Sequence, residues 1–145
     1  MTTTIERSAL VAHSAETMFD LVEAAERYPE RFGWCQAADV ERMDEGRYVA
    51  RLDVGLGRFK TWFKTENTGD RPQRIDMRLV DGPFKTLEGH WRFIALDTHA
   101  CKVALELSFE PASSLLGPVL ALGLQSLADR MVDDFIRAAN KAGLP

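Results

Sequence analysis

Six strand-like segments follow one another at short intervals through the middle of the chain, and one long helix-like segment comes after them. The six segments lie near residues 36–43, 47–54, 58–67, 73–81, 88–96 and 101–110. Alternation is cleanest in the last segment, where Val103, Leu105 and Leu107 share one face while Ala104 and Glu106 share the other. Connections this short cannot hold the crossover that parallel strands require, so the spacing predicts an antiparallel meander.

The residues before the meander predict one more strand and a helix. Residues 4–11 alternate weakly, and Ser14 is a good N-cap for a helix that runs to about Glu26. The pair Tyr28-Pro29 is expected to end this helix, because the residue before a proline avoids the α region. Residues 30–36 then form either a short second helix or a tight loop.

From Ser114 onward the hydrophobic pattern takes the period of an amphipathic helix, with Ser114 and Pro118 as alternative starts. Apolar residues recur at spacings of three or four: Leu120, Leu124, Leu127, Met131, Phe135 and Ala138. A sheet with one apolar face must cover that face, and only this helix is long enough. The chain is therefore predicted to be one α+β domain over residues 1–145, with seven antiparallel strands wrapped around the C-terminal helix.

A sharp turn with large aromatic residues after it lies between the strands at 73–81 and 88–96. Asp81-Gly82-Pro83 breaks the first strand, since glycine tolerates positive φ and proline lacks a ladder donor. Phe84, Trp91 and Phe93 then point to one side of the sheet. These aromatics form either a bulky core or the wall of an apolar cavity, and the choice decides the function.

A curved sheet around a helix leaves apolar space, which suits a hydrophobic ligand. The residues predicted to line it are Trp34, Phe59, Thr61, Phe63, Met77, Phe84, Trp91, Phe93, Leu105, Leu127 and Met131. Asp81, Gly82 and Pro83 are predicted to shape the mouth of the cavity. The alternative is that the same side chains form an ordinary packed core, with Asp81 only fixing its turn.

Lys60, Trp62 and Lys64 alternate with Phe59, Thr61 and Phe63, so they should share the outer face of one strand. We call these three residues the basic strip. They are candidates for contact with RNA through phosphate neutralisation and base stacking. The alternative is a solvated sheet face, and a net charge of -4 gives no general attraction to nucleic acid.

No residue pattern points to catalysis or to a metal. His13, His90 and His99 have no metal-ligand spacing and are predicted to be surface residues. Cys35 lacks an adjacent base, and Cys35 and Cys101 are expected to be free thiols. We expect neither a catalytic residue nor a cofactor, apart from a hydrophobic molecule bound in the predicted cavity.

The chain has no apolar run long enough to span a bilayer and no basic-then-apolar start, so neither a membrane span nor a secretory signal is expected. The segment Leu115 to Leu122 is nevertheless apolar on every side. It is either a docking surface for a membrane or partner, or it is buried at the open end of the sheet.

The Tyr28-Pro29, Phe32 and Trp34-Cys35 segment, the run Leu79 to Phe93 with Asp-Gly-Pro-Phe-Lys, and the order of elements resemble one family. It is the ubiquinone-binding and RatA-like branch of the START/polyketide-cyclase superfamily, and the resemblance covers essentially the whole chain. It implies a helix-grip fold around an apolar tunnel. The residues Arg31-Phe32-Gly33 depart from the Leu-Pro pair that relatives more often carry, so the entrance loop differs here.

The resemblance implies three functions. The first is non-catalytic binding or transport of ubiquinone or another isoprenoid or polyketide-like lipid, which we take as the leading hypothesis. The second, in RatA-like toxins, is binding to the large ribosomal subunit and blocking of subunit association. The third is a polyketide cyclase or dehydrase. We expect a cytoplasmic protein without DNA as a partner, and transient contact with the inner membrane stays open.

Overall fold

The structure is a computed structural model that describes residues 2–141, and within them seven strands form one antiparallel sheet. The strands are β1 (Thr3–Val11), β2 (Cys35–Arg42), β3 (Arg47–Leu56), β4 (Phe59–Asp70), β5 (Arg74–Asp81), β6 (Phe84–Asp97) and β7 (Ala100–Pro111). Their order is β1-β7-β6-β5-β4-β3-β2, a meander to which the first strand is added beside the last. The predicted α+β fold is confirmed.

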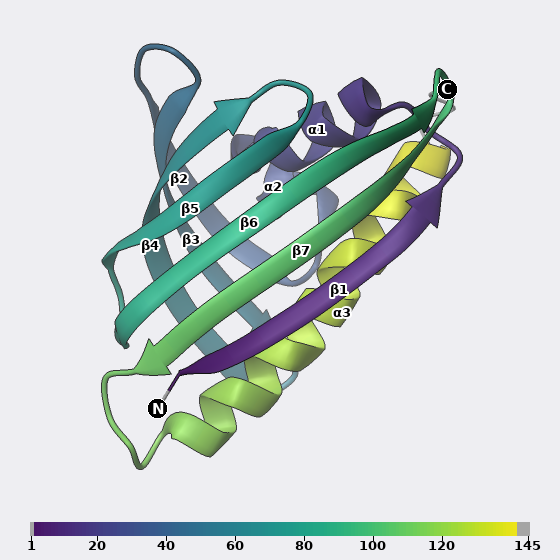
Figure 1. Cartoon of the computed structure of the whole chain (residues 1–145). Coiled ribbons are helices and arrows are strands. Elements are labelled where there is room, and N and C mark those ends of the chain that lie inside the picture. Colours follow the sequence, from purple (N-terminus) through teal and green to yellow (C-terminus); the bar gives the residue numbers. More distant parts are fainter. Residues whose placement is uncertain (1, 142–145) are drawn as a thin grey trace.

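The sheet curves around the long helix α3 (Gly117–Lys141), which runs along its inner side (Figure 1). Helix α1 (Ala15–Glu23), the short 3-10 helix η1 (Ala25–Arg27) and α2 (Tyr28–Arg31) lie between β1 and β2 in the chain. They pack on the same side of the sheet as α3 (Figure 1). The helices thus cover the apolar face of the sheet, as an antiparallel sheet with one solvated face requires.

The start of α1 is as expected, and its end is not. The Ser14 hydroxyl accepts a hydrogen bond from the backbone N–H of Thr17 at 3.1 Å and caps the helix. Helix α1 ends at Glu23 rather than Glu26, and Tyr28-Pro29 opens α2 instead of ending α1. Proline fits the first turn of a helix because its missing N–H has no intrahelical partner there.

The second half of α3 is fastened to the rest of the molecule by polar contacts. Trp34 Nε1 donates to Asp134 Oδ2 at 3.1 Å, and Arg7 Nε lies 3.0 Å from Asp129 Oδ1. His13, predicted at the surface, is instead buried with its Nε2 2.6 Å from Asn140 Oδ1. This contact joins the turn after β1 to the last turn of α3.

An aromatic cluster surrounds Phe135 in the same half of the helix. Its other members are Tyr28, Phe32, Trp34 and Trp91, with ring centroids 5.0 to 6.1 Å from Phe135. Trp34 stacks on Phe32 at 5.0 Å with an interplanar angle of 9°. Aromatic pairs at such distances add to the energy of simple burial. The cluster joins α2, the sheet and α3 into what we call the helical corner.

Candidate functional site: an apolar cavity

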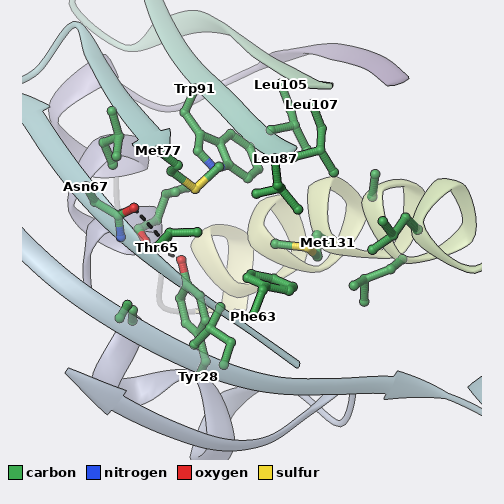
Figure 2. A pocket seen from close by; sticks show the side chains of 18 of the residues that line it. Tyr28, Phe63, Thr65, Asn67, Met77, Leu87, Trp91, Leu105, Leu107 and Met131 are labelled. Atoms are coloured by element: carbon green, nitrogen blue, oxygen red, sulfur yellow. Dashed lines mark hydrogen bonds between the residues drawn. The ribbon is translucent and has the colours of Figure 1, made fainter. Parts of the chain in front are cut away.

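A cavity lies between the inner face of the sheet and α3 (Figure 2). Its free space for water-sized spheres is about 60 Å³. The side chains that line it are Val22, Ala25, Tyr28, Tyr48, Ala50, Leu52, Phe63, Thr65, Asn67, Ile75, Met77, Leu87, Trp91, Leu105, Leu107, Leu124, Leu127, Ala128 and Met131. Pockets that hold drug-sized ligands usually measure about 300 to 1,000 Å³, so a ligand of that size needs side chains to move.

Six of the predicted lining residues border the cavity. They are Phe63, Met77, Trp91, Leu105, Leu127 and Met131. Figure 2 shows Met77 and Trp91 on one side of the space and Met131 on the helix across from them. A Cβ built on Gly89 would lie 2.4 Å from Met77 Cε. The absence of a side chain at Gly89 therefore leaves the space that the Met77 side chain occupies. That any of the six binds a ligand stays a prediction.

Five predicted lining residues lie elsewhere: Trp34, Phe59, Thr61, Phe84 and Phe93. Trp34 belongs to the helical corner. Phe84 packs edge-on against Phe109 with ring centroids 5.9 Å apart, and Phe93 packs in the same way on Phe19 at 5.6 Å. Phe59 and Thr61 are partly buried near one end of β4, beyond the cavity. Phe84, Phe93 and Trp34 therefore pack against other aromatic rings and do not border this cavity.

One end of the cavity is polar, and sequence reasoning missed it. Thr65 Oγ1 donates to Asn67 Oδ1 at 2.8 Å, and both residues are buried (Figure 2). Tyr28 and Tyr48 line the same cavity, and the Tyr28 hydroxyl donates to the carbonyl oxygen of Val22. Thr65 and Asn67 share the strand face of Phe63, so strand parity alone was enough to find them.

Both tyrosines stay neutral. Burial raises the pKa of Tyr28 well above its ordinary value, and burial also raises the pKa of Tyr48. A low-dielectric environment disfavours the phenolate, so each phenol keeps its proton. The polar end of the cavity thus consists of uncharged hydrogen-bonding groups. Such a cavity suits a neutral apolar molecule with a carbonyl or hydroxyl group.

A cluster of charged side chains lies next to Tyr48, which lines the cavity. Arg42 Nη1 lies 2.7 Å from Glu23 Oε2, and Arg42 Nε donates to Glu26 Oε2 at 3.1 Å. The Arg42 guanidinium also lies over the Tyr48 ring, 4.7 Å from its centroid. We call Arg42, Glu23 and Glu26 the Arg42 clasp. It ties β2 to α1 and η1 and covers the tyrosine that lines the cavity.

The predicted mouth residues do not border the cavity. The Asp81 carboxylate accepts a hydrogen bond from the backbone N–H of Gly82 at 2.9 Å, and Gly82 has a φ of 148° that favours glycine. The carbonyl oxygen of Pro83 accepts from Ala112 N at 3.2 Å. Asp81 therefore fixes a turn that packs against the loop before α3, as the structural alternative for this residue predicted.

The basic strip lies on the outer face of β4, and one face of its tryptophan is covered. The Arg51 guanidinium carbon is 4.2 Å from the centroid of the Trp62 ring. Strand pairing sets Asp39 beside Arg51, Arg51 beside Lys64 and Lys64 beside Asp81. Arg51 therefore covers one face of the Trp62 ring, and contact of Trp62 with RNA stays a prediction. Lys60 and Lys64 take part in none of the ion pairs that the described residues form.

The thiols and histidines do not form a reactive group. Cys35 and Cys101 are free, as predicted, and both are buried. Burial raises the pKa of the Cys35 thiol to about 11. Cys35 is therefore a thiol rather than a nucleophilic thiolate at neutral pH. His90 lies on the outer sheet face with its Nδ1 2.8 Å from Asp76 Oδ1. Among residues 2–141, no three His, Cys, Asp or Glu side chains are grouped to hold a metal ion.

Comparison with known proteins establishes the family. Residues 11–136 match the family described as polyketide cyclase / dehydrase and lipid transport. The chain is 39% identical to the ribosome association toxin RatA of Pseudomonas aeruginosa over 97% of this chain and 98% of the relative. It is 42% identical to the RatA protein of Vibrio cholerae over 94% of this chain and 95% of the relative. The chain therefore belongs to the polyketide cyclase/dehydrase and lipid transport family, and within it to the group of RatA proteins.

Solved structures support the same fold. The Zhui aromatase/cyclase from Streptomyces sp. R1128 superposes with a TM-score of 0.87 at 16% identity, covering 97% of this chain and 95% of that one. A START superfamily protein from Mycobacterium smegmatis has a TM-score of 0.74 at 22% identity, covering 96% of this chain and 95% of that one. At such identities the likeness shows the helix-grip fold alone.

Proposed function

We propose that this protein associates with ribosomes, with the large subunit as the expected target. The observation that carries the proposal is the 39% identity to a ribosome association toxin, because it extends over 97% of this chain and 98% of the relative. The small cavity also favours ribosome association over ligand binding, the hypothesis that led from the sequence. About 60 Å³ of free space leaves a hydrophobic ligand without a preformed site.

The outer face of β4 is the surface that we assign to this contact. Lys60 is exposed and Lys64 is partly exposed, on the side of the sheet that faces away from α3. Lysine side chains without an ion-pair partner are able to neutralise RNA phosphates and release counterions. Trp62 lies between the two lysines in sequence and packs one face of its ring on the Arg51 guanidinium.

Cosedimentation with purified ribosomal subunits tests the proposal. We expect the protein to sediment with the large subunit and to dissociate as salt rises, because counterion release makes phosphate contacts salt-sensitive. Lys60→Glu combined with Lys64→Glu should abolish binding. The matched control is Arg92→Glu with Lys102→Glu, two exposed cations on other strands of the same sheet face. Absence of wild-type cosedimentation would refute ribosome association, and retained binding by the first pair would refute only the assigned surface.

A second function, binding of a hydrophobic ligand, is favoured by the polar end of the cavity. A buried Thr65–Asn67 pair inside an otherwise apolar lining is suited to the head group of a quinone or other isoprenoid. Met77 and Met131 are the side chains that a ligand would displace, since methionine readily changes rotamer. The ligand would have to enlarge the space that the structure shows.

Native mass spectrometry with organic extraction tests ligand binding. A protein purified from its own host should carry a stoichiometric quinone or isoprenoid. Leu127→Phe, which fills the cavity, should reduce the bound fraction, while Leu122→Phe on the exposed side of the same helix should not. A protein that stays empty after incubation with quinones would leave the cavity as a packing defect.

A further inference from the structure

An arginine and a tryptophan from neighbouring strands form a cation–π pair on the outer face of the sheet. The guanidinium carbon of Arg51, on β3, lies 4.2 Å from the centroid of the Trp62 ring, on β4. The Arg51 side chain is 46% exposed, so nearly half of it is open to solvent although one side rests on the indole. We call these two residues the Arg51–Trp62 pair. Its exposed part presents a planar cationic group, which is a stacking surface for another planar group.

A carboxylate helps to hold the guanidinium in place. Arg51 Nη2 lies 3.3 Å from Asp53 Oδ1, and Arg51 Nε donates to the same oxygen at 3.4 Å. Strand pairing sets Asp53 directly opposite Trp62, so the carboxylate and the indole ring meet the guanidinium from neighbouring positions. A side chain that is already ordered loses less conformational entropy when a ligand binds to it. The Arg51–Trp62 pair is therefore prepared for stacking before any partner arrives.

Two lysines flank the pair on the same face of the sheet. Lys64 lies opposite Arg51 in the strand pairing. A Cβ built on Gly55 would lie 3.1 Å from Lys60 Cγ, so the stem of this lysine lies over β3, the strand that carries Arg51. Neither lysine belongs to an ion pair formed within residues 2–141. Trp62 thus has an ammonium group two residues away in each direction along its strand.

The charges around the pair limit what it can bind. Strand pairing sets Asp39 beside Arg51 and Asp81 beside Lys64, so the row of four residues across β2, β3, β4 and β5 has no net charge. Double-stranded RNA is recognised mainly through its shape and its phosphates, and phosphate contacts depend on an excess of positive charge. A row without net charge contributes little to such contacts. Stacking on the Arg51–Trp62 pair needs no excess of charge.

We propose that the Arg51–Trp62 pair binds an unpaired RNA base, which stacks on the exposed part of the guanidinium while Lys60 and Lys64 contact the flanking phosphates. Unpaired bases stack on aromatic rings and on arginine guanidinium planes, whereas the bases of a continuous duplex are stacked on one another. The RNA that this surface takes is therefore single-stranded. That this RNA is ribosomal rests on the proposed function, and the preference for a single strand does not.

Titration of the full chain with oligouridylate, followed by tryptophan fluorescence, tests the proposal. Trp34 and Trp91 are both 2% exposed and Trp62 is partly exposed, so a fluorescence change on binding reports mainly Trp62. The single strand should bind at least about tenfold more tightly than the same strand annealed to oligoadenylate. Arg51→Lys keeps the charge but removes the planar group. It should weaken single-strand binding by about tenfold and leave duplex binding unchanged.

The matched control is Arg47→Lys, at an exposed position on the outer face of the same strand, which should leave both affinities unchanged. Trp62→Leu removes the ring that supports the guanidinium and should weaken single-strand binding as Arg51→Lys does. Trp62→Phe keeps an aromatic ring and should retain most of this binding. Thermal unfolding confirms that each variant is folded.

Equal affinity of the wild type for the single strand and the duplex would overturn the proposal, as would a wild type that binds neither RNA. It is also overturned if Arg51→Lys binds oligouridylate as tightly as the wild type. Cosedimentation of both proteins with the large ribosomal subunit separates this proposal from ribosome association. Equal cosedimentation of the wild type and Arg51→Lys would refute base stacking on the ribosome alone. Single-strand binding without any cosedimentation would support the stacking site and refute ribosome association.

Discussion

Two regions along α3 have opposite relations to the rest of the protein. One is the helical corner around Phe135 in the second half of the helix. The other is the exposed group Leu115, Leu116, Val119 and Leu122 at and just before the start of the helix, which we call the apolar tip. At the helical corner Phe135 is 1% exposed inside an aromatic cluster, and Asp134 accepts a hydrogen bond from Trp34. At the tip, Leu115 and Leu122 contact mainly solvent. The same helical period thus serves two purposes: the second half holds the fold together, and the first half presents a surface.

The comparison predicts that apolar truncations cost very different amounts in the two regions. Phe135→Ala should lower the free energy of unfolding by about 3 to 5 kcal/mol, because it leaves a cavity within packed rings. Leu122→Ala should change it by less than about 0.5 kcal/mol. Urea unfolding of both variants measures the difference. If both variants lost the same free energy of unfolding, the apolar tip would be part of the core, and the contrast between the two regions would be wrong.

A polar contact at the helical corner gives the next largest effect. Asp134→Ala removes the acceptor for Trp34 Nε1 and leaves that buried N–H unpaired, which should cost about 1 to 3 kcal/mol. Asp133→Ala, at an exposed position on the same turn of helix, is the control and should be nearly neutral. Tryptophan fluorescence together with urea unfolding reports both. A neutral Asp134→Ala would show that ring packing alone fastens this half.

The contact between Phe59 and Gly123 tests how firmly the first half of α3 is held. Gly123→Ala raises helix propensity by about 1 kcal/mol, yet its methyl group would lie 2.4 Å from the Phe59 ring. We expect net destabilisation of about 1 kcal/mol from overpacking. Adding Phe59→Ala should make the alanine at 123 favourable, and a thermal double-mutant cycle measures this reversal. If Gly123→Ala alone stabilises the protein, the first half of the helix is free to shift.

The Arg42 clasp should give the smallest effect, one that depends on pH. The hydrogen bond from Arg42 lowers the pKa of Glu26 below its ordinary value of 4.5, so the unfolded state binds a proton more readily than the folded state. The clasp therefore stabilises the fold above that ordinary pKa and loses its effect as pH falls through the lower folded value. Glu26 is 46% exposed, which limits the contribution to less than about 1 kcal/mol.

Arg42→Gln measures the clasp. The difference in melting temperature between this variant and the wild type should be present at neutral pH and should shrink as pH falls through the acid range. Arg47→Gln, an exposed arginine on the adjoining strand β3, should show no such difference. A difference that is constant with pH would assign the effect of Arg42 to its contact with Tyr48 rather than to the carboxylates.

Sequence patterns were sufficient for the fold because each strand shows its own alternation. Val103, Leu105 and Phe109 are buried on one face of β7, as their spacing indicated. The turn at Asp81 was equally readable, since its chemistry is local. Periodicity shows which side of a strand faces inward. Periodicity does not show at which positions the inward side chains fill the interior and at which they border a cavity.

The cavity was predicted only in part for this reason. Phe84 and Phe93 face inward like Trp91, but each meets another aromatic ring and fills its space. His13 is buried by Asn140, more than a hundred residues later in the chain, and no local pattern indicates that contact. The exposure of Leu122 was likewise undecided, because a segment that is apolar all round does not reveal which side is covered.

The pairing of β1 with β7 has a consequence for how the chain is made. Thr3 lies opposite Phe109, so β1 has its partner strand more than a hundred residues later in the chain. Non-local pairings of this kind form slowly, because a long loop must close before any contact stabilises it. During synthesis β1 therefore has no strand to pair with until β7 has emerged from the ribosome, and only then is the sheet completed.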